Sequence, residues 1–198
     1  MPLLSGLALI FAISCAASPP HATAPTPALA CDARQTRILR DADARAAPWS
    51  TAQHLAKNFP DGRVAWLMPD DKYRRYVVAT GATRWGRCDG AGCFVFVAPA
   101  GIIHAVVARS MADGHHDAAA IGRALGLPAE RFAGPLRMMT LDLRATRACA
   151  RLPVERDPGA SSCATAPCFQ FGGYTSGGVP ELMVIDAPVD RTTIESVP

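Results

Sequence analysis

The chain has 198 residues, of which 49% are hydrophobic and 19% charged, with a formal net charge of +3, and this balance predicts a globular chain with a sizeable core. Its arginines are interspersed with acids and its only lysines are Lys57 and Lys72, which excludes the basic stripe typical of nucleic-acid-binding proteins. The sequence contains no phosphate-loop, HExxH or GxGxxG motif, which excludes the commonest nucleotide-binding and zinc-protease sites.

The N-terminal segment predicts export. Residues 1–30 contain no Lys, Arg, Asp or Glu and include an apolar run over residues 3–14. This run is shorter than the roughly 20 apolar residues of a membrane-spanning helix and has the length of a signal-peptide core. We therefore expect residues 1–30 to be a signal peptide with a tether rich in Pro, Ala and Thr, followed by a single globular domain over residues 31–198.

The site of cleavage stays open between two kinds of processing. The small residues before Cys15 are typical of a lipid-modified cysteine, whereas residues 22–24 and 28–30 are each typical of ordinary signal-peptide cleavage. We expect the protein to be periplasmic, attached to the outer membrane through a lipid on Cys15, or secreted. The lipid would be its only contact with a membrane.

The predicted elements of the domain mix helices and strands. Ser50 is typical of an N-cap and predicts a short helix over residues 51–57, and a second helix is predicted over residues 117–127. The predicted strands cover residues 63–68, 73–80, 93–97, 101–108, 136–143 and 181–185. This order predicts the α+β class, with a mostly antiparallel sheet, few helices and a single domain stapled by disulfides.

Six cysteines follow the predicted leader. An even number in an exported chain predicts disulfide bonds, and we expect no metal ion. Two pairs share a spacing of four intervening residues, which predicts two tight, stapled turns, and the remaining pair would join the start of the domain to its later half. Fifteen pairings are open to six cysteines, and the predicted pairs are Cys88–Cys93, Cys163–Cys168 and Cys31–Cys149.

Several polar residues could in principle be catalytic or bind a metal, but the neighbouring sequence does not favour either role. His115 and His116 are adjacent, so on a helix they point in different directions, and they predict a solvated helix start. His104 lies among apolar residues and predicts a core histidine. Tyr174 stands where a nucleophile elbow around Ser176 needs glycine, so this stretch predicts a Gly-rich loop.

The C-terminal segment places a single acid, Glu181, at the start of an apolar strand, after a Gly-rich loop and before a turn that ends in Ile194. This segment resembles the bacterial ADP-ribosyltransferase toxins of the cholera and pertussis type and the related exported NAD glycohydrolases. Residues 38–48 are similar to the first strand of that family, with Arg40 followed by an Asp-x-Arg-x-Pro-like stretch. Residues 94–99 are similar to a central strand of the family.

The resemblance implies an enzyme that cleaves the bond between nicotinamide and ribose in NAD, with transfer or hydrolysis of the ADP-ribose. Arg40 would hold the phosphates by bidentate hydrogen bonds. The Glu181 carboxylate would stabilise the positive charge that develops on the ribose. Thr80 or Thr83 would stand where the family orders the NAD site with Ser-Thr-Ser. Val179 stands where arginine-modifying toxins carry Glu or Gln, which leaves NAD hydrolysis, another acceptor residue or lost activity open.

A second hypothesis is a periplasmic, disulfide-bonded lipoprotein without catalysis. It would be a binding, inhibitor or immunity module that recognises a protein target or an envelope protein, and the predicted anchor, tether and disulfides favour it. The two hypotheses differ in one structural requirement. The enzyme needs Arg40 and Glu181 in one cleft, whereas a binding module needs an exposed apolar patch or a protruding loop.

Overall fold

The sheet at the centre of the protein is antiparallel throughout. The computed structural model describes residues 29–46, 50–154, 169–170 and 172–198. The sheet has seven strands, with the path β11-β6-β1-β3-β10-β7 and the short strand β2 paired to β3. The strands are β1 (Arg63–Pro69), β2 (Arg87–Asp89), β3 (Gly92–Pro99), β6 (Leu136–Asp142), β7 (Cys149–Arg151), β10 (Leu182–Ile185) and β11 (Thr193–Val197). This architecture confirms the predicted α+β class and its antiparallel pairing.

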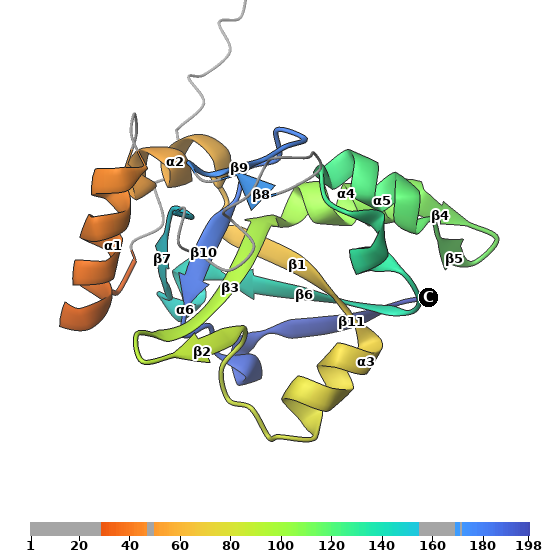
Figure 1. The fold of residues 1–198 in the computed structure, drawn as a ribbon, viewed down its shortest axis with the longest axis horizontal. Coiled ribbons are helices and arrows are strands. Elements are labelled where there is room, and N and C mark those ends of the chain that lie inside the picture. Colours follow the sequence, from red (N-terminus) through yellow and green to blue (C-terminus); the bar gives the residue numbers. More distant parts are fainter. Residues whose placement is uncertain (1–28, 47–49, 155–168, 171) are drawn as a thin grey trace, which may run out of the picture.

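The helices pack around the sheet, and α3 lies next to β1 and β6. Figure 1 shows α1 and α2 near β7 and β10, and α4 and α5 at the opposite end. The helices are α1 (Ala33–Arg45), α2 (Thr51–Asn58), α3 (Asp70–Tyr73) with a π-helical continuation (Arg74–Val78), α4 (Ala100–Ser110), α5 (Ala118–Leu125), α6 (Leu143–Thr146) and the 3-10 turns Ala129–Phe132 and Val189–Arg191. Two small ladders pair β4 (Met111–Ala112) with β5 (His115–His116) and β8 (Phe169–Gln170) with β9 (Tyr174–Thr175).

Each face of the sheet packs a separate core, because successive side chains of a strand point to opposite faces. On one face Val97 packs with Leu55 of α2 and with Trp85. On the other face Ala98 packs with Ile103 of α4 and with the side chains of α5. The second face extends beyond α4 and α5 toward α1, and this extension carries the site described below.

Several predicted elements are confirmed. The helix α2 begins after its N-cap residue Ser50, which forms a capping box with Gln53. The helix α5 begins after its N-cap residue Asp117, whose side chain accepts hydrogen bonds from two backbone N–H groups. Strands β1, β3, β6 and β10 match four of the predicted strands within a few residues. Two predicted disulfides are present, Cys31–Cys149 and Cys88–Cys93, and the second closes the β2-β3 hairpin.

Two predicted strands are wrong, because residues 73–78 and 101–108 are helical and residues 79–80 form a turn. Both segments follow a strand that ends in proline, at Pro69 and at Pro99, and each proline is the N-cap of the helix. In α4 the buried residues recur with helical spacing, as Ile103, Val106, Val107 and Ser110 show. The apolar run over residues 101–108 is so short that its sequence fits a buried strand as well as a helix, and the burial pattern in the structure identifies the helix.

The family resemblance implies a strand over residues 38–48, and this prediction is also wrong. Its described residues belong to α1 up to Arg45. The helix starts with a capping box, in which Asp32 accepts from the backbone of Gln35 and the Gln35 side chain accepts from the backbone of Asp32. His115 and His116 form β5 and not the start of a helix, which begins after Asp117.

Candidate functional site

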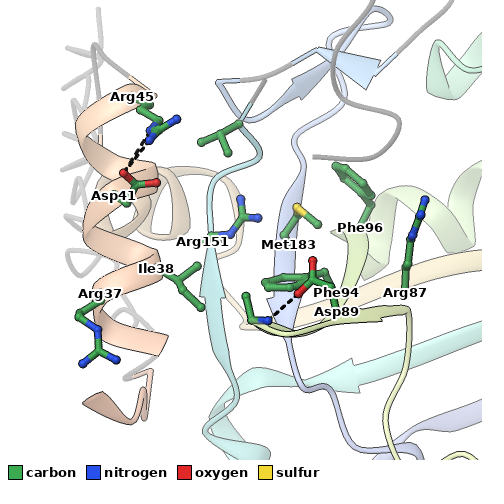
Figure 2. Close-up of a pocket in the computed structure, with 12 residues that line it drawn as sticks. Arg37, Ile38, Asp41, Arg45, Arg87, Asp89, Phe94, Phe96, Arg151 and Met183 are labelled. Carbon is green, nitrogen blue, oxygen red and sulfur yellow. Dashed lines mark hydrogen bonds and ion pairs between the residues drawn. The ribbon is translucent and has the colours of Figure 1, made fainter. Parts of the chain in front are cut away.

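A groove of about 510 Å³ lies between α1 and the sheet face formed by β3, β10 and β7 (Figure 2). Its volume falls within the range of roughly 300–1,000 Å³ that is typical of small-molecule sites. Phe94, Phe96 and Met183 supply an apolar floor, and Ile38 points from α1 toward the strands. The groove is thus a concave, largely apolar surface bounded by a helix on one side.

The strand register explains how this floor is assembled. Phe96 pairs with Met183, and Met183 pairs with Arg151, so these three residues form one row across β3, β10 and β7. Phe94 is two residues from Phe96 on β3 and therefore lies on the same face. The guanidinium of Arg151 is 5.3 Å from the centroid of the Phe94 ring, within the range of a cation–π contact.

The helix α1 is fixed to the sheet at its N-terminal end. The disulfide Cys31–Cys149 ties the residue before the helix to β7. Arg34 forms an ion pair with Asp186 at 2.6 Å, and the side chain of Gln35 donates a hydrogen bond to the same carboxylate at 3.0 Å. Partial burial would raise the pKa of Asp186, but these bonds and one from the Cys93 backbone outweigh it and lower the pKa.

The charged residues around the groove carry an excess of positive charge. Arg45 pairs with Asp41 at 3.0 Å along α1. Among the other residues that line the groove, three are arginines and one is an aspartate. Arg151 is only 5% exposed and donates a hydrogen bond to the backbone carbonyl of Leu152 at 2.8 Å, so its guanidinium is held in place. The charged lining residues are Arg37, Arg45, Arg87, Arg151, Asp41 and Asp89. This arrangement favours a ligand that is anionic at one point and apolar elsewhere.

A smaller cavity of about 80 Å³ lies on the same sheet face, beside the groove. Phe96 lines both spaces, and Glu181, immediately before β10, lines the cavity. Glu181 is 3% exposed, and its Oε2 atom has no hydrogen-bond partner among the described residues. Burial raises the pKa of Glu181 to about 8, although the positive charge of Arg131 opposes this effect. The side chain is therefore predominantly a neutral carboxylic acid at pH 7.

A buried polar cluster lies behind Glu181, against α2. Burial lowers the pKa of His54 to about 4, while the backbone of Glu181 acts in the opposite direction. The Asn58 amide lies 3.0 Å from His54 Nδ1 and donates to the Tyr174 hydroxyl, also at 3.0 Å. Gly173 has a φ of +93°, and a Cβ there would lie 2.8 Å from His54 Cε1. This close packing indicates that the cluster has a structural role.

Neither the groove, the cavity nor the pocket beside Val189 brings the predicted NAD-site residues together. Arg40 is exposed on α1 and lines neither the groove nor the cavity. Thr80 is exposed, and its hydroxyl donates to the Tyr76 carbonyl at 2.8 Å. Thr83 is exposed in a separate shallow pocket near Val189. Of the predicted residues, Glu181 alone lines the cavity beside the groove.

The sequence interpretation missed the residues that line the groove. Arg37, Asp41 and Arg45 recur at four-residue intervals, which places them along one side of a helix. Phe94 and Phe96 alternate along a strand and share a face. Both signals are local, and neither indicates that the helix and the strand form two sides of one groove.

Some predicted residues lie outside the part of the chain that the structure describes. They are Cys15 and the pair Cys163 and Cys168, together with residues 1–28 of the predicted leader and tether. In the described ranges, no group of three or more His, Cys, Asp or Glu residues could hold a metal ion. None of the helices in those ranges has the length and apolar character needed to cross a membrane.

Comparisons with known proteins give no further assignment. Scans against protein-family models, curated proteins and solved structures returned no match. The resemblance to ADP-ribosyltransferases therefore stays a prediction from the sequence, and the case for a function rests on the groove and the cavity.

Proposed function

We propose that the protein is an exported, disulfide-bonded binding protein whose groove takes a small anionic molecule with an aromatic or aliphatic body. The excess of arginines beside an apolar floor is the observation that supports this proposal most. Guanidinium groups match carboxylates and phosphates through paired hydrogen bonds. Phe94, Phe96 and Met183 provide the surface on which the apolar body would lie.

This function shares with the second hypothesis an exported module without catalysis, but its ligand is a small molecule and not a protein. The NAD-cleaving hypothesis has less support, because Arg40 lines neither the groove nor the cavity that Glu181 lines. A neutral Glu181 is also a poor stabiliser of developing positive charge at pH 7. NAD is itself an anion with aromatic ends, so it belongs among the ligands to be tested.

The proposal is tested with a charged probe and its neutral counterpart. Isothermal titration calorimetry of the oxidised protein would compare 3-phenylpropanoate with 3-phenylpropanamide at low salt. We expect the carboxylate to bind about tenfold more tightly, since a hydrogen bond to a charged group contributes roughly 1.5–3 kcal/mol. Arg87→Gln, which removes a charge from the groove, should reduce this preference. Arg109→Gln on α4 is the matched control and should not.

Equal affinity for the two probes, or an equal effect of the two arginine substitutions, would contradict the proposal. A parallel assay would follow nicotinamide release from NAD by the parent protein, Arg40→Lys and Glu181→Gln. We expect no release. Turnover that both substitutions abolish would instead support the enzyme hypothesis.

A further inference from the structure

We infer that the small cavity beside Phe96 is an inner subsite of the groove, which takes an uncharged hydrogen-bonding group, such as a carboxamide or hydroxyl, at the apolar end of the same anionic ligand. The inference rests on the proposed binding function and adds the chemistry of the second end of the ligand. Four features support it: the shared sheet face, the shared lining residue Phe96, the unpartnered Oε2 atom of Glu181 and the mainly apolar walls.

The groove and the cavity lie along one face of the sheet. Phe96 pairs with Met183 in the groove, and Leu182 pairs with Val97. Continuing this register by one residue places Glu181 opposite Ala98, in the next row on the face of Phe96 and Met183. Ala98 and Glu181 both line the cavity, and Phe96 lines both spaces. A ligand whose body lies on Phe96 can therefore extend along this face to Glu181.

The carboxyl of Glu181 is suited to an uncharged group. Its Oε2 atom is buried and has no hydrogen-bond partner among the described residues, although buried polar groups in native proteins are nearly always hydrogen-bonded. A protonated carboxyl offers one O–H donor and a carbonyl acceptor. A carboxamide or hydroxyl can satisfy both, whereas a second anion would leave the donor and acceptor pattern unmatched.

The remaining walls decide which end of the ligand enters the cavity. Apart from Glu181 and Thr175, the cavity is lined mainly by apolar and aromatic residues, among them the buried Ile103, Phe132 and Val179, so a charged group placed there would lose most of its hydration. The cavity of about 80 Å³ exceeds the roughly 10–15 Å³ that one water molecule requires, so it has room for a group of a few heavy atoms. The anionic end is therefore assigned to the arginines and the neutral end to Glu181.

The test uses two probes that differ only at the far end, 3-phenylpropanoate and 3-(4-carbamoylphenyl)propanoate. Calorimetry would give their affinities, and methyl NMR would follow Ile38, which lines the groove, and Ile103, which lines the cavity. We expect both probes to shift the Ile38 signal and only the carbamoyl probe to shift Ile103. The carbamoyl probe should bind about tenfold more tightly, as expected for a buried hydrogen-bonded pair.

Two substitutions of one residue identify the group responsible. Glu181→Leu should remove the tenfold difference between the two probes. Glu181→Gln keeps a hydrogen-bond donor and an acceptor, so it should retain most of the difference in affinity between the two probes. Both variants remove a buried ionisable group, so thermal unfolding should confirm that they are folded.

The outcomes separate the inner subsite from the groove. A shift of Ile38 alone, with equal affinities for the two probes, would overturn the inner subsite and leave the binding function of the groove supported, with the cavity holding water only. No shift of either methyl and no saturable binding would overturn both. Retention of the tenfold difference in Glu181→Leu would also overturn the role assigned to this carboxyl.

Discussion

The buried carboxyl of Glu181 is expected to make the protein less stable as the pH rises from about 5 to 8. Burial raises its pKa to about 8 in the folded protein, against an ordinary value of 4.5. Between these values the folded state keeps the proton and the unfolded chain releases it, so the free energy of unfolding falls as the pH rises. At 1.36 kcal/mol per pH unit, the whole effect is roughly 5 kcal/mol, of which about 3 kcal/mol is lost by pH 7.

Glu181→Gln removes the titration with little change of shape. Its stability should match that of the parent near pH 5 and should exceed it by a few kcal/mol at pH 8, because the folded parent must either keep a proton that the unfolded chain releases or place a charge in an apolar site. Glu195→Gln is the matched control, since Glu195 is exposed on β11. It should follow the pH dependence of the parent.

The assay is urea unfolding with the disulfides intact, followed by tryptophan fluorescence at intervals from pH 5 to pH 9. The quantity compared is the difference in unfolding free energy between the parent and Glu181→Gln at each pH, which cancels the titration of other groups. A difference that stays constant from pH 6 to pH 9 would refute the reasoning. It would show that the carboxyl is solvated in the folded protein.

Two further predictions concern His54 and the disulfides. Burial lowers the pKa of His54 to about 4 from 6.5, so neutral His54 contributes roughly 3 kcal/mol to the free energy of unfolding above pH 6.5, and this contribution is lost as the pH falls through 4. His54→Gln should therefore make the stability measured by urea unfolding less dependent on pH in this acid range. An unchanged dependence would contradict this prediction. The Cys31–Cys149 bond spans 118 residues, so replacing both cysteines by alanine should cost about 4–5 kcal/mol in thermal or urea unfolding and weaken binding of 3-phenylpropanoate by loosening α1. The Cys88–Cys93 bond spans 5 residues, so the same change there should cost about 2 kcal/mol, and equal losses for the two pairs would count against the loop-length argument.

The sequence predicted the strands of the sheet where local patterns and turn residues agreed. Residues 63–68 and 93–97 became β1 and β3, and Ser50 correctly marked the start of α2. Residues 101–108 became α4 because the packing of Ile103 and Val107 on one side of a helix covers the sheet. A short apolar run carries no periodicity that separates these outcomes, so the tertiary packing decided.

The candidate site was less accessible to sequence analysis than the fold. Glu181 was singled out as an acid at the start of an apolar strand, and the structure adds its burial and its raised pKa. The groove joins α1 to Phe94, Arg151 and Met183, which lie far apart in the sequence. The sheet register, the Cys31–Cys149 bond and the contacts of Arg34 and Gln35 with Asp186 bring these segments together, and none of them follows from a local pattern.

The protonation of Glu181 separates the two functional hypotheses, because they require opposite states of the same group. Donation of a hydrogen bond to an uncharged ligand group needs the neutral acid, which predominates below a pKa of about 8 and is lost above it. Stabilisation of an oxocarbenium-like ribose needs the carboxylate, which gains population over that same range. The tenfold preference for the carbamoyl probe should therefore decline as the pH rises from 7 to 9. An NAD-cleaving activity that depended on Glu181 would increase over the same interval, so the direction of the pH dependence identifies which chemistry the carboxyl serves.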